Sequence, residues 1–107
     1  MGVKGDKHTN EAQLSAEFLV EKLSEIDGIT SKKMFGGHGI FHEGKMFGIV
    51  DSKGQTYLKT NEESVDEYVK KGAIPHGKMP YHSIPEGVLS APSELIRLAR
   101  KSIEISK

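Results

Sequence analysis

Residues 34–50 of the chain, MFGGHGIFHEGKMFGIV, combine five glycines with three phenylalanines and two histidines. Loops are rarely this apolar, and helices are rarely this rich in glycine because glycine destabilises a helix interior. We therefore expect strand, turn and strand here. The glycines should then occupy bends, turns or points where two backbones approach closely.

Two glycine-containing dipeptides set the expected geometry of this region. Gly36-Gly37 should bend or bulge a strand that starts at Ile29, since paired glycines inside a strand pattern usually mark such a distortion. Glu43-Gly44 should form a two-residue hairpin turn, with glycine where positive φ is tolerated. In the strand after this turn, the two-residue period predicts two faces: Met46, Gly48 and Val50 on one, and Phe47 and Ile49 on the other.

The segment before this region has the spacing of an amphipathic helix. The helical pattern begins at Asn10, Thr9 or Asn10 is the expected cap, and Gly28 is the expected end. Residues 1–9 are small and charged, so we expect a flexible lead followed by one domain over 10–107. The apolar positions that recur at three and four residues are Ala12, Ala16, Leu19, Leu23 and Ile26.

After the hairpin the pattern continues with shorter elements. A third strand is expected over 55–59, followed by a helix that Thr60 and Glu63 would open as a capping box and Gly72 would end. Pro80 and Pro85 suggest that the short extended piece between them is an edge strand. A last amphipathic helix, with a mostly basic outer face, is expected from Pro92.

The expected order is therefore helix, three strands, helix, one or two short strands, helix. Strands that are grouped between helices and joined by hairpin turns predict an α+β domain, with helices packed on an antiparallel sheet.

Bulk composition narrows the function classes. The chain has 107 residues, 15 basic and 15 acidic side chains, and no cysteine. The balanced charge argues against unaided nucleic-acid binding, and the lack of cysteine excludes disulfides and thiolate chemistry. The polar start is unlike a signal peptide, and no run of about 20 apolar residues suggests a membrane span. We expect a cytoplasmic protein.

No residue set reaches the standard of a catalytic or cofactor site. His38 and His42 lie four apart and should share a strand face, which leaves a histidine-based metal or ligand site as an alternative. Gly36-Gly37-His38-Gly39 is followed by a strand, so no helix N-terminus is offered to a phosphate. His82-Ser83 would point apart on a strand, which argues against nucleophilic catalysis. No catalytic residue, cofactor or metal ligand is assigned.

The sequence supports an interaction surface better than a catalytic or metal site. Met34, Phe35, Met46 and Phe47 are more apolar than one small sheet face needs, so some of them could contact a partner. The basic residues of the last helix, with Lys32 and Lys33, could form a nucleic-acid surface if the fold gathered them, although no recognition motif accompanies them.

Several short stretches of the sequence resemble those of one family. They are Ser31-Lys32-Lys33-Met34-Phe35-Gly36-Gly37-His38-Gly39-Ile40-Phe41, Gly44-Lys45-Met46-Phe47, Tyr57-Leu58-Lys59-Thr60, Met79-Pro80-Tyr81 with Ile84-Pro85, and the helix around Leu95–Lys101. Together they are similar to the N-terminal domain of the TfoX/Sxy proteins, regulators of natural competence, over roughly residues 13–102. The resemblance implies a two-layer fold of order α-β-β-β-α-β-β-α, like that of secretion chaperones. It brings no catalytic residues.

The resemblance also implies a regulatory module that acts through protein contacts, with transcription machinery or the cyclic-AMP receptor protein as partner. A homodimer and weak DNA binding through the last helix are alternatives. The better-known members carry a second, C-terminal domain. The residues expected to form the interaction surface are Met34, Phe35, Gly36, Gly37, His38, Tyr81, Arg97, Arg100 and Lys101.

Overall fold

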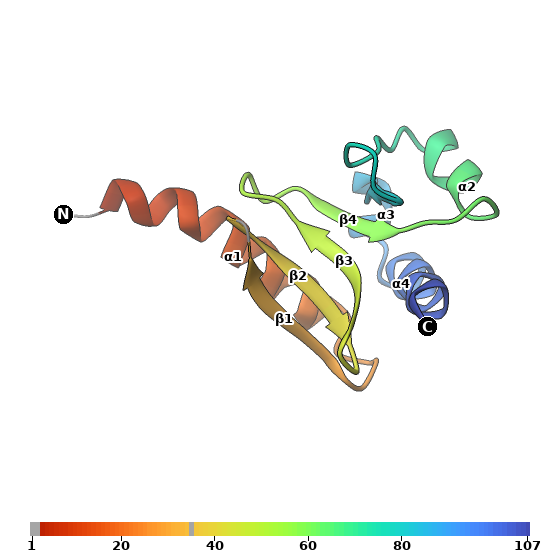
Figure 1. Cartoon of the computed structure of the whole chain (residues 1–107), viewed down its shortest axis with the longest axis horizontal. Helices are drawn as coiled ribbons and strands as arrows, with labels where there is room; N and C mark the ends of the chain where they lie inside the picture. Colours follow the sequence, from red (N-terminus) through yellow and green to blue (C-terminus); the bar gives the residue numbers. More distant parts are fainter. Residues whose placement is uncertain (1–2, 35) are drawn as a thin grey trace.

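The computed structural model describes the backbone of residues 3–34 and 36–107, and the side chains of 11–34 and 36–107. Within these residues the chain forms four helices and five strands (Figure 1). The helices are α1 (Val3–Lys22), α2 (Val65–Lys70), α3 (Glu86–Leu89) and α4 (Pro92–Ser106). The strands are β1 (Ile29–Met34), β2 (Gly37–His42), β3 (Lys45–Val50), β4 (Thr56–Lys59) and β5 (Tyr81–Ser83).

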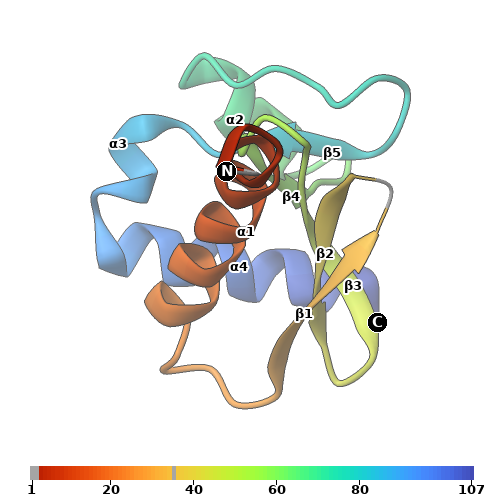
Figure 2. The ribbon, with the colours of Figure 1, turned by 90° about the vertical axis from the view of Figure 1, so that its left-hand side faces the viewer.

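The five strands form one antiparallel sheet whose spatial order, β1-β2-β3-β4-β5, is also their order in the chain. Helices α1 and α4 lie on the same side of this sheet (Figure 2), with α1 against β1 and β2 and α4 against β3 and β4. The structure therefore confirms the α+β class and the two-layer arrangement. None of the helices in the described part of the chain is long and apolar enough to cross a membrane.

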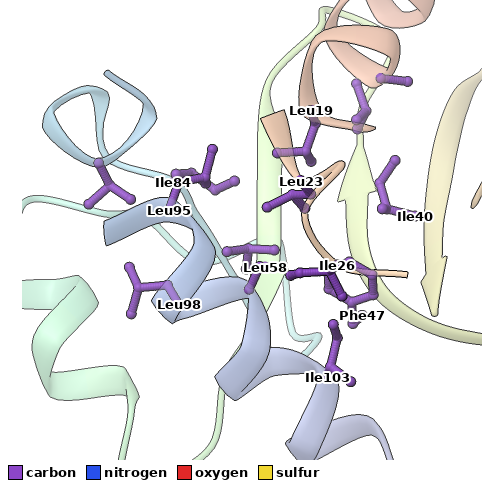
Figure 3. Packing of buried hydrophobic residues seen from close by; sticks show 14 of the residues in the cluster. Leu19, Leu23, Ile26, Ile40, Phe47, Leu58, Ile84, Leu95, Leu98 and Ile103 are labelled. Atoms are coloured by element: carbon purple, nitrogen blue, oxygen red, sulfur yellow. The ribbon is translucent and has the colours of Figure 1, made fainter. Parts of the chain in front are cut away.

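The hydrophobic core lies between the helices and the sheet (Figure 3). Both helices contribute fully buried leucines, such as Leu19 and Leu98, and the strands contribute Ile40, Phe47 and Leu58 from the facing side. The apolar positions expected on the first helix, including Ala16, are buried, as the three-and-four spacing predicts.

The glycine pair does not bend a single strand, as the sequence suggested; it lies at a hairpin turn between two strands. Met34 pairs with Gly37, so β1 folds back on β2, and Gly36 has a φ of 79°. Such a φ is strained for a residue with a Cβ and free for glycine. The segment expected to be one distorted strand is thus β1 and β2, which makes four strands before α2 and one after it.

The hairpin at Glu43-Gly44 is confirmed, but the faces expected for the strand after it are wrong. Both turn residues have positive φ, and His42 pairs with Lys45. The register then shifts: Phe41 pairs with Met46, whereas Ile40 pairs with Gly48. Phe47 is the extra residue of a β-bulge, so strict alternation breaks at this point.

The bulge decides which side chains enter the core. Phe47 is fully buried on the helix side together with Val50, while Met46 and Ile49 are half-buried on the opposite side. The Met46 carbonyl lies at the bulge and accepts hydrogen bonds from Ser106 Oγ at 3.0 Å and Tyr81 Oη at 3.4 Å. The C-terminal turn of α4 is thereby tied to the bulge.

Helix starts also differ from expectation. Helix α1 begins at Val3 rather than near Asn10, so Thr9 and Asn10 lie inside it, and it ends at Lys22 rather than at Gly28. Leu23 and Ile26 therefore lie in the turns that follow the helix. The proposed flexibility of residues 1–9 stays a prediction. The cap before α2 is not made by Thr60: the backbone N–H groups of Glu63 and Ser64 donate to Asn61 Oδ1, and Asn61 N donates to Ser64 Oγ. This reciprocal pair is a capping box shifted by one residue.

Candidate interaction surface

The sheet has a second face, away from α1 and α4, that we call the open face. Directly opposed residues of antiparallel strands share a face, so the register assigns its members. Apolar and small side chains dominate it, and its strand residues include two lysines and no carboxylate. The members are Thr30, Lys32, Met34, Gly37, Gly39, Phe41, Met46, Ile49, Tyr57, Lys59, Tyr81 and Ser83.

A cavity of about 320 Å³ opens on this face, between the strands and the loop before β5. We call it the methionine hollow, because three of the four methionines of the chain line it. Its wall is mainly apolar, and Met79 at its rim is 44% exposed. The lining residues are Met34, Gly37, His38, Met46, Ile49, Val50, Asp51, Ser52, His76 and Met79.

Gly39 forms the floor beside the hollow. A Cβ at this position would lie 2.7 Å from the sulfur of Met34 and 3.0 Å from the sulfur of Met46, with the ring of Phe41 at 2.9 Å. The missing side chain therefore leaves a space that two thioethers and a phenyl edge occupy. Since methionine is unbranched and flexible, it fills such irregular gaps well.

The loop before β5 covers the other half of the open face. The ring of His76 packs edge-on against Tyr57 at 4.6 Å between centroids, and His76 N donates to the Tyr81 carbonyl. Tyr57 and Tyr81 are consequently buried although they face away from the helices. Burial raises the pKa of Tyr81.

Asp51 ties the hollow to the following turn. Its Oδ1 accepts from the backbone N–H groups of Lys53 and Gln55, and its Oδ2 accepts from the Tyr57 hydroxyl at 3.1 Å. Burial raises the pKa of Tyr57, and the negative charge of Asp51 and their hydrogen bond raise it further. The carboxylate is thus held in place rather than free to rotate.

The structure brings part of the predicted surface together. Met34 and Gly37 line the hollow, Gly36 is in the turn that leads into it, and Tyr81 lies on the same face beneath the loop. His38 also borders the hollow, but it pairs with Val50 and its side chain therefore belongs to the helix-covered face. Phe35 lies outside the described residues.

The three basic residues of the predicted surface are not part of this group. Arg97, Arg100 and Lys101 lie on α4, which packs on the opposite face of the sheet. Arg97 pairs with Glu67 and, at 2.8 Å, with Glu94, and Arg100 lies 3.7 Å from Glu25.

The predicted interaction surface did not include Ile49, His76 and Met79, and Met46 was named only among the apolar residues that could contact a partner. The hairpin at Glu43-Gly44 carried a signal for Met46, because its register places Met46 opposite Phe41. The loop residues carried no such signal, since nothing local to them specifies which strands the loop covers.

The described histidines do not form one cluster. His76 lines the methionine hollow, His38 lies opposite Val50 on the helix-covered face, and His42 lines a separate pocket with Lys45 and Lys107. His82 Nδ1 lies 3.0 Å from Thr60 Oγ1. Among the described residues, no group of three or more histidine, cysteine, aspartate or glutamate side chains is placed to hold a metal ion.

A comparison with known protein families also identifies this domain. The model of the TfoX N-terminal domain matches residues 21–106. The chain belongs to this family. The match covers the whole sheet, the methionine hollow and α4, and the resemblance drawn from the glycine-rich words is confirmed. No curated protein matches the chain.

Proposed function

We propose that this TfoX N-terminal domain is a non-enzymatic binding module that recognises a partner protein through the methionine hollow. The observation that carries the proposal is the apolar cavity on a sheet face that the helices leave uncovered. Exposed apolar hollows of this kind are typical of contact sites, and methionines adapt to the shape of a partner.

The charge around the hollow indicates what the partner offers. Lys32 and Lys59 lie on the open face by register, and Lys78 is exposed in the loop. Asp51 is the one carboxylate among the residues that line the hollow, and its oxygens already accept hydrogen bonds. The partner we propose is therefore a protein segment with one apolar anchor side chain and acidic neighbours, which electrostatic complementarity would orient.

The biological role we propose follows the family: regulation of transcription, including competence, in the cytoplasm through protein contacts and without catalysis. The cyclic-AMP receptor protein is the first partner to test. Direct DNA binding is the weaker candidate, because Arg97 and Arg100 on α4 already face carboxylates. Such pairing lowers the positive field that phosphates require.

Surface plasmon resonance with purified cyclic-AMP receptor protein and RNA polymerase tests the proposal. Ile49→Lys places a charge in the hollow and should weaken binding by at least about tenfold, the loss expected for a central contact. The matched control is Leu14→Lys, since Leu14 is an exposed apolar residue on α1, away from the hollow. It should leave binding unchanged.

Sedimentation equilibrium covers the alternative of a second copy as partner. Self-association that Ile49→Lys abolishes would place a homodimer at the hollow. If the wild-type chain binds neither protein and stays monomeric, or if both variants weaken binding equally, the proposal is wrong.

A further inference from the structure

Soft metal ligands are concentrated in the methionine hollow. Met34, Met46 and Met79 line it together with His76. These include three of the four methionines of the chain. They come from β1, β3 and the loop before β5, so only the folded protein gathers them.

Two of the sulfurs are close neighbours. Those of Met34 and Met46 both lie within 3.0 Å of the point where a Cβ on Gly39 would stand. The absence of that Cβ is what allows the two thioethers to approach each other over the strand. Because thioethers are neutral and polarisable, they favour soft cations and bind zinc, magnesium or calcium poorly.

The imidazole of His76 supplies a second, independent observation. Its Nδ1 is buried and has no hydrogen-bond partner among the described residues. A buried polar atom without a partner is costly and calls for an explanation. A neutral imidazole nitrogen with a free lone pair is also the commonest protein ligand for transition metals.

The two possible metal ligands of the loop before β5, His76 and Met79, lie at the ends of one tight turn. Met79 N donates to the His76 carbonyl at 3.1 Å, and Gly77 has a φ of 59°. His76 itself is fixed against Tyr57. The fixed Asp51 carboxylate, which also lines the hollow, supplies a nearby negative charge to a monovalent cation.

We propose that the methionine hollow is a copper(I) site, in which the thioethers of Met34 and Met46 and the imidazole of His76 are ligands and Met79 closes the rim. Copper(I) suits these donors because it is soft and accepts few ligands. The inference does not rest on the proposed partner, since the isolated chain should bind the ion.

Anaerobic titration with copper(I) against the chromophoric chelator bicinchoninate tests the proposal, with silver(I) as a redox-inert probe. One ion should bind per chain. In spectra of protein with ¹³C-labelled methionine methyl groups, silver(I) should shift the signals of Met34, Met46 and Met79 and leave that of Met1 in place. This measurement needs no variant, so it stands even if a substitution impairs folding.

The variants separate ligands from packing. Met34→Leu with Met46→Leu keeps the apolar volume and should weaken copper(I) binding by at least about tenfold, because even second-shell losses cost that much. His76→Gln should weaken it similarly. Ile49→Val in the hollow and His42→Gln outside it are matched controls and should change nothing.

Three results would overturn the site. The first is an inability to compete with bicinchoninate together with unshifted methionine methyl signals. The second is binding that survives the double leucine substitution. The third is a preference for zinc(II) that depends on the histidines alone. If the copper(I) site is disproved, the proposal that the hollow binds a partner protein is unaffected. If no partner protein binds, the proposed copper(I) site is likewise unaffected.

Discussion

The two faces of the same sheet are built on different principles. The helix-covered face carries branched or aromatic side chains that are fully buried, such as Ile40, Phe47 and Leu58. The open face carries methionine and glycine around a hollow, with Met34 and Met46 half-buried. Branched side chains have few rotamers and fix one packing, whereas methionine keeps three rotatable bonds. One face thus holds the fold together, and the other retains freedom to accommodate a ligand.

The largest difference in stability is expected between substitutions of two β3 residues that lie on opposite faces of the sheet. Phe47→Ala should lower the free energy of unfolding by about 4 kcal/mol, because it leaves a cavity in a sealed core. Ile49→Ala, on the open face, should cost only about 1 kcal/mol, since its side chain is half-buried beside a space that already exists. Urea unfolding measures both values. Equal losses would show that the faces do not differ.

Two glycines of β2 provide a second test. A Cβ on Gly37 would collide with the Val50 carbonyl and the Asp51 backbone, which cannot move without separating β2 from β3. Gly37→Ala should therefore cost about 3 kcal/mol.

The matched variant is Gly39→Ala, whose Cβ would meet the flexible ends of Met34 and Met46. It should cost about 1 kcal/mol and narrow the methionine hollow. Guanidinium unfolding compares the two variants, and a greater loss at Gly39 would contradict the assigned contacts.

A smaller effect is expected at the hydroxyl of Tyr68 within the core. Its oxygen is buried without a hydrogen-bond partner among the described residues, so Tyr68→Phe should stabilise the protein by up to about 1 kcal/mol. Burial raises the pKa of Tyr68 to about 12, although the neighbouring Ser102 hydroxyl acts in the opposite direction. Unfolded tyrosine loses its proton near pH 10, whereas the buried hydroxyl keeps its proton up to about pH 12. The stability of the wild-type protein should therefore be unaffected by this group below pH 10 and should fall as the pH rises toward 12.

Thermal unfolding between pH 8 and pH 12 measures this change. Tyr68→Phe should lessen the alkaline loss of stability, with Tyr68→Leu as a control for packing. An alkaline profile that the phenylalanine variant leaves unaltered would contradict the assignment.

The smallest effect concerns the outer side of the helix layer. The hydrogen bond from Arg97 lowers the pKa of Glu67 below its ordinary value of 4.5. The carboxylate therefore stabilises the folded state above pH 4.5, and this contribution is lost as the pH falls through the lowered pKa. Glu67→Gln should cost less than about 1 kcal/mol at pH 7, because the pair is partly exposed and screened.

This loss should disappear at pH 3 and shrink at high salt, which differential scanning fluorimetry can follow. Glu104→Gln, which removes an exposed ion pair with Lys107 at the end of α4 rather than one between α2 and α4, is the control. A difference between wild type and Glu67→Gln that persists at pH 3 would contradict the role of the charge.

Much of the fold could be predicted because its signals are local. The spacing of Leu19 and Leu23, the Glu43-Gly44 turn and Pro92 each specify an element through nearby residues. The turn at Gly36-Gly37 was missed because a glycine pair fits a bend and a hairpin equally well. The bulge at Phe47 was missed because it depends on how β2 and β3 pair, which strand alternation alone does not reveal.

The candidate site was harder to predict because its parts come from distant segments. Met34 and His38 were expected at a surface, but their neighbours His76 and Met79 lie some forty residues further along the chain. The basic helix face was predicted correctly as a pattern, yet Glu67 opposite Arg97 depends on how α2 meets α4. Contacts of this kind leave no periodic trace in a single sequence.

The order of the sheet has a consequence for synthesis of the protein. Every strand pairs with its neighbour in the chain, so the sheet can form from contacts between residues that are close in sequence. Such local contacts favour rapid folding. Helix α4 is synthesised after all five strands, however, and it covers β3 and β4. On the ribosome, the apolar side chains of Phe47 and Leu58 therefore stay exposed to water until this fifteen-residue helix has been made. During that interval the β3–β4 half of the sheet lacks its helix, while α1 already covers β1 and β2, so a chaperone would bind the nascent chain at the β3–β4 half.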